Sequence, residues 1–399
     1  FTGNTEMIVG SDQFTAGSIS VGIDPLVHSA FVHQAGTIKT GAVMIGEGQY
    51  ELHDGVLQTR RIQISDGAGA GYFYQYNGLL AASYIEIGGN GFGQFHLSGA
   101  GQAGTSQNPV RMDVKGSDIE QTGGTIYAAS VHLECVTRNE GTMQHTLASK
   151  YTFSGGSLEA GTIEMQGDSW TEVVTCPPDM PPGECEDEEV QHTEYAEMTQ
   201  SGGSVKIAGL NIHPYGRYIY QGGSFLPKAL KVAENAQLDF TGQSLTIVID
   251  DGILDIVDGQ ILNASSVNVT LGPNSLLVLN ELQDVDAITA LFGSFSCSGA
   301  VHLKGTGLVI DSAEVFGVSG SLTDPVMVNG SIDLSHDDSL RLDGGTSVEN
   351  GGAVTIDDHS HFATSDLYLG ESGPATLNIM DPNTTIEVSS SLTLGPDSI

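Results

Sequence analysis

Three short stretches near the end of the sequence carry carboxylates and imidazoles between apolar strands. They are Ser335-His-Asp-Asp338, Asp357-Asp-His-Ser-His361 and Asp381-Pro-Asn383. If the flanking strands stack as turns of a solenoid, these side chains lie about 4.8 Å apart per turn. Carboxylates at that distance repel one another unless a cation such as Ca²⁺, which prefers several oxygen ligands, lies between them.

This pattern predicts a Ca²⁺ site, and Ca²⁺ is the one cofactor that the sequence suggests. Its ligands would be Asp337, Asp338, Asp357, Asp358 and Asp381. The alternative is that Asp and Asn occupy these positions because they tolerate tight turns.

The longest interruption of the strand pattern, at residues 168–194, combines two cysteines with a run of acids. Cys176 and Cys185 bracket a Pro-rich loop with no second Cys or His pair nearby, which favours a local disulfide over a zinc site. Such a disulfide indicates a protein outside the reducing cytoplasm. Two further cysteines, Cys135 and Cys297, are predicted to be buried free thiols.

The same insertion is a candidate interaction loop, because insertions in repeat proteins often carry the binding surface. The alternative is a solvated acidic loop. The residues of this interaction loop would be Glu184, Glu186, Asp187, Glu188 and Glu189.

Catalytic patterns are scarce, and we predict that the chain is not an enzyme. The sequence has no Gly-x-Ser-x-Gly, no His-Glu-x-x-His and no Gly-rich phosphate loop. The adjacent acids Asp250-Asp251 and Asp357-Asp358 are poor acid–base couples, because neighbouring residues on a strand point to opposite faces. Four histidines recur near equivalent strand positions and are expected to have packing roles: His33, His53, His96 and His132.

Tyrosines support one alternative, a carbohydrate-active β-helix such as a polysaccharide lyase or tailspike-like depolymerase. Aromatic rings on one face would provide stacking surfaces, although several of these tyrosines alternate inward and are expected in the core. The tyrosines are Tyr72, Tyr74, Tyr76, Tyr84, Tyr215, Tyr218 and Tyr220.

The elements that position these residues are imperfect repeats. The segment Tyr151-Thr-Phe-Ser-Gly-Gly-Ser-Leu-Glu-Ala-Gly-Thr-Ile-Glu-Met165 has two alternating strands about a Gly-Gly corner. Related units recur at intervals typical of solenoid coils, about 20–25 residues. Their corner glycines, which would supply positive φ, are Gly36, Gly55, Gly78, Gly99, Gly124 and Gly156.

The repeats predict an all-β chain that folds as a right-handed parallel β-helix (β-solenoid) with loop insertions. We expect an N-terminal cap or lead-in strand at 1–30 and a solenoid with Gly-Gly corners at 31–241. Residues 242–399 would continue the solenoid with longer strands and an unfinished final repeat. The alternative is a break into a second β-domain near Gly242. Residues 281–292 form the one helix candidate.

The charge and hydropathy of the chain limit the classes of partner that it can bind. The chain has 13 Lys and Arg against 49 Asp and Glu, a net charge of −36. Nucleic acid is disfavoured because phosphate binding needs clustered cations. No apolar run is long enough to span a bilayer.

The motifs Tyr-x-x-Ser-Gly-Gly-x-Leu-x-Ala and Leu367-Tyr-Leu-Gly-Glu-Ser-Gly-Pro-Ala-Thr-Leu-Asn-Ile379 resemble repeats of secreted bacterial β-solenoids of the autotransporter-passenger and PEP-CTERM-associated type. This resemblance implies an extracellular or cell-surface protein with adhesive, matrix or biofilm roles. Because a solenoid has open end rungs, we expect end-to-end self-association into a fibre, matrix or surface layer. A glycan or a neighbouring cell surface is the further partner expected.

Overall fold

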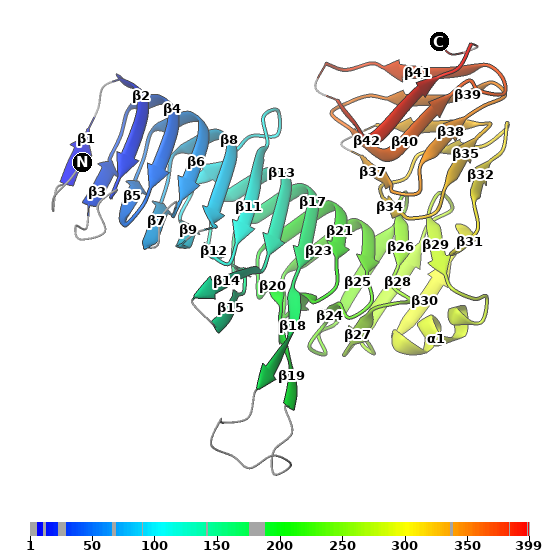
Figure 1. Cartoon of the computed structure of the whole chain (residues 1–399), viewed down its shortest axis with the longest axis horizontal. Helices are drawn as coiled ribbons and strands as arrows, with labels where there is room; N and C mark the ends of the chain where they lie inside the picture. The colour runs from blue at the N-terminus through cyan, green and yellow to red at the C-terminus, as the bar shows by residue number, and fades with distance from the viewer. Residues whose placement is uncertain are drawn as a thin grey trace.

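A computed structural model shows two arms of stacked β-coils that meet at an angle (Figure 1). It describes residues 6–10, 13–22, 29–65, 69–89, 91–140, 143–174, 188–335, 338–382, 384–396 and 398. The N-terminal arm contains β1 to β31, and the C-terminal arm contains β32 to β42. Strands of successive coils pair in parallel, and side-chain hydrogen bonds such as that of Asn263 with Asp239, 24 positions apart, also join the coils. The predicted parallel β-solenoid is confirmed.

One side of the N-terminal arm is the narrow sheet, which has one short strand per coil. Its strands, in spatial order, are β1 (Glu6–Val9), β3 (Ser29–His33), β5 (Gly48–Leu52), β7 (Ala70–Gln75), β9 (Phe92–Leu97), β12 (Asp118–Gln121), β16 (Lys150–Phe153), β20 (Ala196–Gln200), β22 (Gly216–Tyr220), β24 (Gln237–Asp239) and β27 (Gln260–Leu262). Inward residues stack in register, with the rings of Phe31, Tyr50, Phe73 and Phe95 4.9 to 5.4 Å apart. The intervening residues therefore face outward.

The wide sheet forms the other sides of this arm from longer strands. They are β2 (Gln13–Val21), β4 (Thr37–Ile45), β6 (Val56–Ile64), β8 (Leu79–Gly88), β10 (Gln102–Ala103), β11 (Val110–Lys115), β13 (Thr125–Glu134), β17 (Ser157–Gln166), β21 (Ser204–Ile212), β23 (Ser224–Val232), β26 (Ile253–Asp255), β29 (Leu276–Leu279) and β31 (Ala300–Leu303). Regular alternation of burial breaks near the middle of the long strands, where Gly41 and Gly161 fall outside the pairing ladder. Each long strand thus supplies two sides of its coil.

From residue 245 the long strand is replaced by separate short ones. A side sheet of β25 (Leu245–Ile249), β28 (Val267–Leu271) and β30 (Ser294–Cys297) runs beside the last wide-sheet strands. The predicted helix is confirmed as α1 (Asp284–Leu291), which buries Ile288. The longer strands predicted for 242–399 are wrong, because most strands there have three to five residues.

The C-terminal arm is a second stack of parallel coils. One sheet contains β32 (Leu308–Ile310), β35 (Val326–Val328), β38 (Thr346–Val348), β40 (His361–Leu369), β37 (Ser339–Leu342), β34 (Gly320–Leu322) and β42 (Thr385–Leu394). The other contains β33 (Val315–Phe316), β36 (Ser331–Leu334), β39 (Gly352–Ile356) and β41 (Ala375–Ile379). Its apolar core continues onto Ile253, Leu276 and Val278 of the N-terminal arm, so the two arms share buried contacts.

The described part of residues 1–30 forms coils like those that follow, since β1 pairs with β3 and β2 pairs with β4.

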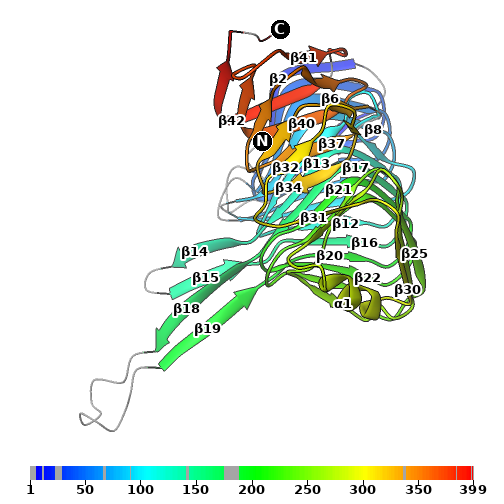
Figure 2. The ribbon, with the colours of Figure 1, turned by 90° about the vertical axis from the view of Figure 1, so that its right-hand side faces the viewer.

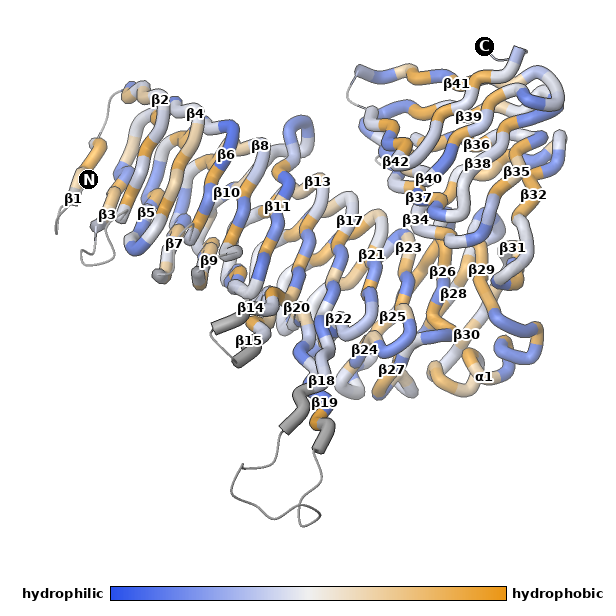
Figure 3. Tube along the Cα trace, viewed as in Figure 1, coloured by the Kyte–Doolittle hydropathy of each residue, from blue (hydrophilic) through white to orange (hydrophobic). Residues whose placement is uncertain are grey.

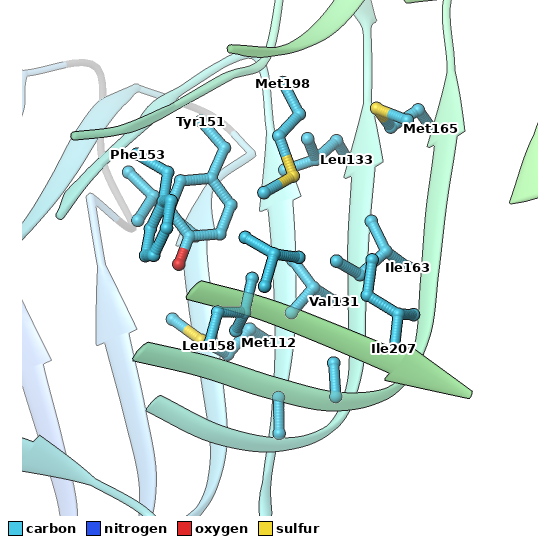
Figure 4. Close-up of a cluster of buried hydrophobic side chains, with 14 of the residues drawn as sticks. Met112, Val131, Leu133, Tyr151, Phe153, Leu158, Ile163, Met165, Met198 and Ile207 are labelled. Carbon is cyan, nitrogen blue, oxygen red and sulfur yellow. The ribbon is translucent and has the colours of Figure 1, made fainter. Parts of the chain in front are cut away.

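Apolar and polar residues alternate along the tube in Figure 3, as the period of a half-buried strand requires. Inside the N-terminal arm, Tyr151, Phe153 and Leu158 belong to one apolar cluster with Met198 of the next coil (Figure 4). A continuous core of this kind holds successive coils together.

Buried amides support the corners. Gln121 Nε2 donates to the carbonyl oxygens of Gly124 and Ser157, at 3.4 and 3.0 Å, and its Oε1 accepts a 2.6 Å hydrogen bond from Tyr151. Gln200 makes the equivalent contact with Tyr218 at 2.5 Å. Polar groups in these coils are thereby paired inside an apolar core.

Candidate functional site

The carboxylates that we predicted to form a Ca²⁺ column differ in their surroundings. Asp338 is buried, its Oδ1 lies 2.9 Å from Lys228 Nζ, and it accepts a 3.0 Å hydrogen bond from Ser319 Oγ. The backbone N of Asp338 lies 3.2 Å from Ser360 Oγ on the next coil, so its neighbour there is a serine and not another acid. Asp338 therefore pairs with a lysine of the N-terminal arm, and its role as a Ca²⁺ ligand stays a prediction.

The other predicted ligands lie in turns. Asp357 Oδ1 accepts a 2.9 Å hydrogen bond from the backbone N of Asp358, whose φ is 52°. The carbonyl of Asp381 accepts a hydrogen bond from Thr384. Asp337 lies outside the described residues, and within those that are described no group of three or more His, Cys, Asp or Glu is arranged to hold a metal. Tight turn geometry accounts for Asp357 and Asp358.

The predicted insertion contains an antiparallel hairpin, β18 (Asp168–Val174) with β19 (Glu188–Glu194). The ring of Trp170 stacks on His192 across the hairpin, with centroids 5.2 Å apart. A second hairpin, β14 (Val136–Glu140) with β15 (Met143–Leu147), projects on the same side (Figure 2), and Thr137 Oγ1 donates to Asp168 Oδ2 at 2.5 Å.

The chemistry predicted for the tip of the insertion lies outside the described residues. This applies to Cys176 and Cys185 and to the acids Glu184, Glu186 and Asp187, whereas Glu188 and Glu189 begin β19. The disulfide and the interaction loop therefore stay predictions.

The two remaining cysteines are both free thiols but differ in exposure. Cys135 is buried, and burial raises the pKa of its thiol to about 11. Cys297 is exposed, so the prediction that both thiols are buried is wrong for Cys297. Cys297 pairs with the buried Leu271 of β28 and so holds an inward position, but its strand β30 is the edge strand of the side sheet and leaves it exposed.

The four histidines do not occupy equivalent positions. His33 faces the core, and burial lowers its pKa. His53 and His96 lie on the outer face of the narrow sheet, 2.8 Å from Glu51 and 3.2 Å from Glu120. The prediction that these histidines hold equivalent packing positions is therefore wrong, because His33 lies in the interior whereas His53 and His96 face outward.

Six of the seven tyrosines fall into three groups, and the seventh, Tyr215, lies just before β22 (Gly216–Tyr220) with a φ of 60°. Tyr218 and Tyr220 point into the core. Tyr84 lies on the wide sheet between the guanidinium groups of Arg61 and Arg111, 5.8 and 6.0 Å from its ring, and it donates a 2.7 Å hydrogen bond to Asp113. Tyr72, Tyr74 and Tyr76 occupy alternate outward positions on and just after β7.

The third group, Tyr72, Tyr74 and Tyr76, belongs to a cluster of aromatic and charged side chains on the surface, which we call the tyrosine face. Its members are Tyr72, Tyr74, Tyr76, His53, His96, Glu51 and Glu120. The Tyr72 and Tyr74 rings are nearly parallel with centroids 6.1 Å apart, and Tyr74 and Tyr76 are 6.5 Å apart. His53 stacks on Tyr76 at 4.7 Å. The result is a row of rings on a rigid sheet.

Carboxylates flank this row on both sides. Glu51 accepts hydrogen bonds from His53 at 2.8 Å and from Gln49 at 2.7 Å. Partial burial raises the pKa of Tyr74 and of Tyr76, and the charge of Glu51 adds to the rise, so both phenols stay protonated donors. The face therefore combines aromatic surface, hydroxyl donors and carboxylate acceptors.

Sequence reasoning missed the two His–Glu pairs. The segment Tyr50-Glu-Leu-His53 carries the signal for one of them, because residues two apart on a strand share a face. The pair of His96 with Glu120 could be predicted only from the pairing of the strands. That pairing places Tyr74, His96 and Glu120 side by side on β7, β9 and β12.

A second group of titratable residues lies where the arms meet. Glu164 on β17 influences the pKa of His213, Arg341 and His361, two of which belong to the C-terminal arm. His361 Nε2 lies 3.9 Å from Glu387 Oε2. Burial lowers the pKa of both histidines. We call these five residues the inter-arm group.

The fold and the tyrosine face define a two-armed β-solenoid with an aromatic surface site. Comparisons of the chain with protein-family models, curated proteins and solved structures found no match. In the described residues, no helix has the length and apolar character needed to cross a membrane.

Proposed function

We propose that this chain is an extracellular structural or adhesive protein that binds glycans through the tyrosine face and has no catalytic role. The observation that carries the proposal is the row of Tyr72, Tyr74 and Tyr76 between two carboxylates on an outer sheet surface. Sugar rings have an apolar face that packs on aromatic rings, and their hydroxyls pair with carboxylate and phenol groups. The resemblance to secreted bacterial solenoids supports the extracellular location.

Charge narrows the class of glycan. Two glutamates lie in the face, and the whole chain has a net charge of −36. Uronic acid or sulfated polymers would meet like charge, whereas neutral or amino-sugar polymers would not. The proposed ligand is therefore a neutral or amino-sugar polysaccharide, on a neighbouring cell or in a matrix.

Affinity electrophoresis in gels that contain a soluble neutral glucan, chitosan or alginate tests this function. We expect retardation by the glucan or chitosan, loss of retardation in Tyr74→Ala, and normal retardation in Tyr127→Ala. Tyr127 is a matched control because it also faces outward, but on the wide sheet. Equal retardation of wild type and Tyr74→Ala would refute the role of the tyrosine face.

End-to-end association is the second part of the proposal. Leu392 and Leu394 of β42, which pairs with β40, are 55% and 62% exposed, and Ile379 and Met380 at the end of β41 in the other sheet of this arm are 58% and 65% exposed. An exposed apolar edge strand is a template for a further strand, which a second copy would supply. Light scattering over a concentration series should show growing mass for wild type and less growth for Leu392→Lys. Monomers at every concentration would contradict this part.

A carbohydrate-active enzyme is the competing function, and the inter-arm group favours it. Glu164 and Glu387 come from different arms, and both influence the pKa of His361 and of Arg341. Two carboxylates across a site are the usual machinery of glycoside hydrolysis. Release of reducing ends from a polysaccharide panel, abolished by Glu164→Gln, would replace our proposal with this one.

A further inference from the structure

A groove on the outer face of the C-terminal arm lies apart from the tyrosine face. It has a volume of about 320 Å³, within the range of small-molecule sites. Four successive coils contribute to it. Its lining consists of Gly307, Leu308, Val309, Pro325, Val326, Met327, Gly344, Gly345, Thr346, Ser347, Asp366 and Tyr368.

Strand register explains the shape of the groove. Val309, Met327, Ser347 and Tyr368 are paired in order on β32, β35, β38 and β40, so they form one outward ridge. Val309 and Met327 are 47% and 45% exposed, although they are apolar. Three steps between strands give the ridge a length of about 14 Å.

The groove is hollowed beside this ridge because the residues that form its floor have small side chains or none. Gly307 and Gly345 precede the ridge residues of their strands by two positions, and Pro325 holds the same place on β35. The backbone N of Leu308 donates to the carbonyl of Pro325, and Val326 N donates to that of Gly345. Paired backbone thus forms the floor.

One end of the groove has an uncompensated negative charge. Asp366 Oδ1 accepts a 2.6 Å hydrogen bond from Ser391, and Oδ2 accepts a 3.2 Å bond from Ser365. These serines, together with Ser390, lower the pKa of Asp366, so it is ionised at neutral pH. In the part of the chain that the structure describes, its partners are hydroxyls and amides and include no cation.

We propose that this groove binds an alkylammonium compound, with the cationic head at Asp366 and Tyr368 and the alkyl chain along Met327 and Val309. A cation gains from the carboxylate and from the face of an aromatic ring. An alkyl chain gains by covering apolar side chains that are otherwise exposed. The length of the ridge suits a chain of about eight carbons better than a compact cation.

Calorimetric titration with octyltrimethylammonium, below its micelle concentration, tests the site. We expect one saturable equivalent to bind, and weaker binding of tetramethylammonium, which lacks the tail, and of octanoate, which lacks the cation. Asp366→Asn should weaken binding about tenfold. Asp333→Asn is the control for general attraction to this acidic chain, because Asp333 is exposed on β36 outside the groove.

A blocking variant gives a second test that does not alter charge. A Cβ at Gly307 would meet only Pro325, at 3.6 Å or more, and its φ is not positive, so Gly307→Leu should fold and fill the groove. An unchanged thermal transition checks the fold of each variant. The proposal is overturned if Asp366→Asn or Gly307→Leu binds the probe as wild type does, if octanoate binds equally well, or if binding never saturates.

Discussion

Lys228 Nζ lies 2.9 Å from Asp338 Oδ1, although the two residues are 110 positions apart in sequence. Lys228 belongs to β23 of the N-terminal arm, and Asp338 precedes β37 of the C-terminal arm. Ser319 Oγ donates to the same carboxylate oxygen, and Ser321 Oγ lies 3.3 Å from Asn211 Oδ1 nearby. This polar contact joins the arms where their apolar cores also meet.

Asp338→Asn should destabilise the protein by about 2 kcal/mol, because it removes the charge of a buried carboxylate that pairs with the partly buried Lys228. Chemical denaturation measures this loss. The control is Asp343→Asn, which breaks the exposed pair of Asp343 with Arg341 and should cost about 0.5 kcal/mol or less. Equal losses of unfolding free energy in the two variants would contradict a larger contribution from the pair of Lys228 with Asp338.

Gly156→Ala should lower the melting temperature much more than Gly209→Ala. Gly156 has a φ of +85°, and an added Cβ would lie 2.2 Å from the carbonyl oxygen of Gly124, whereas at Gly209 the nearest atom is 3.7 Å away. We expect a loss of about 2 to 3 kcal/mol at Gly156 and under about 1 kcal/mol at Gly209. Similar melting curves for both variants would contradict the role of the corner.

His213 should make stability depend on pH. Burial lowers its pKa below 6.5, against the opposing effect of Glu164, while Lys231, His132 and Arg341 lower it further. The unfolded chain then binds a proton that the folded chain does not, so stability present above pH 6.5 is lost as pH falls through the folded pKa. Melting temperatures from about pH 7 to about pH 5 should fall less steeply in His213→Gln than in wild type. Parallel curves would refute this.

Thiol labelling should separate the cysteines. Without reductant, Cys297 should react fast with iodoacetamide, because it is exposed, and Cys135 slowly, because burial raises its pKa to about 11. If Cys176 and Cys185 form the predicted disulfide, they react only after reduction. Mass spectrometry that finds all four cysteines alkylated without reductant would exclude the disulfide.

Repeat geometry was predictable because its signals are local. Gly124 and Gly156 mark corners that need positive φ, and alternating residues such as Tyr151 and Phe153 mark inward positions. By contrast, the orientation of Tyr74 could not be read from its own strand. Phe73 beside it is also aromatic, so period-two alternation fits either face, and only the stacking of Phe73 on neighbouring coils turns Tyr74 outward.

The change of direction between the arms depends on contacts distant in sequence. Ile253 and Val278 are buried against the C-terminal core, on the side of their strands that elsewhere faces solvent. The continuous apolar run Leu276-Leu-Val-Leu279 was a signal of burial on both faces, although it does not say what covers the second one. The pairing of Lys228 with Asp338 could not be predicted for a related reason, since the lysine comes from the other arm.

Binding of a soluble oligosaccharide to the tyrosine face is the most direct test of the proposed glycan-binding function. We would titrate wild type, Tyr74→Ala and Tyr127→Ala calorimetrically with oligosaccharides of the polymer that retards the protein. We expect saturable binding that falls about tenfold or more in Tyr74→Ala, from the loss of one ring, and stays unchanged in Tyr127→Ala. Full affinity in Tyr74→Ala, or binding of acidic oligosaccharides in preference to neutral ones, would contradict it.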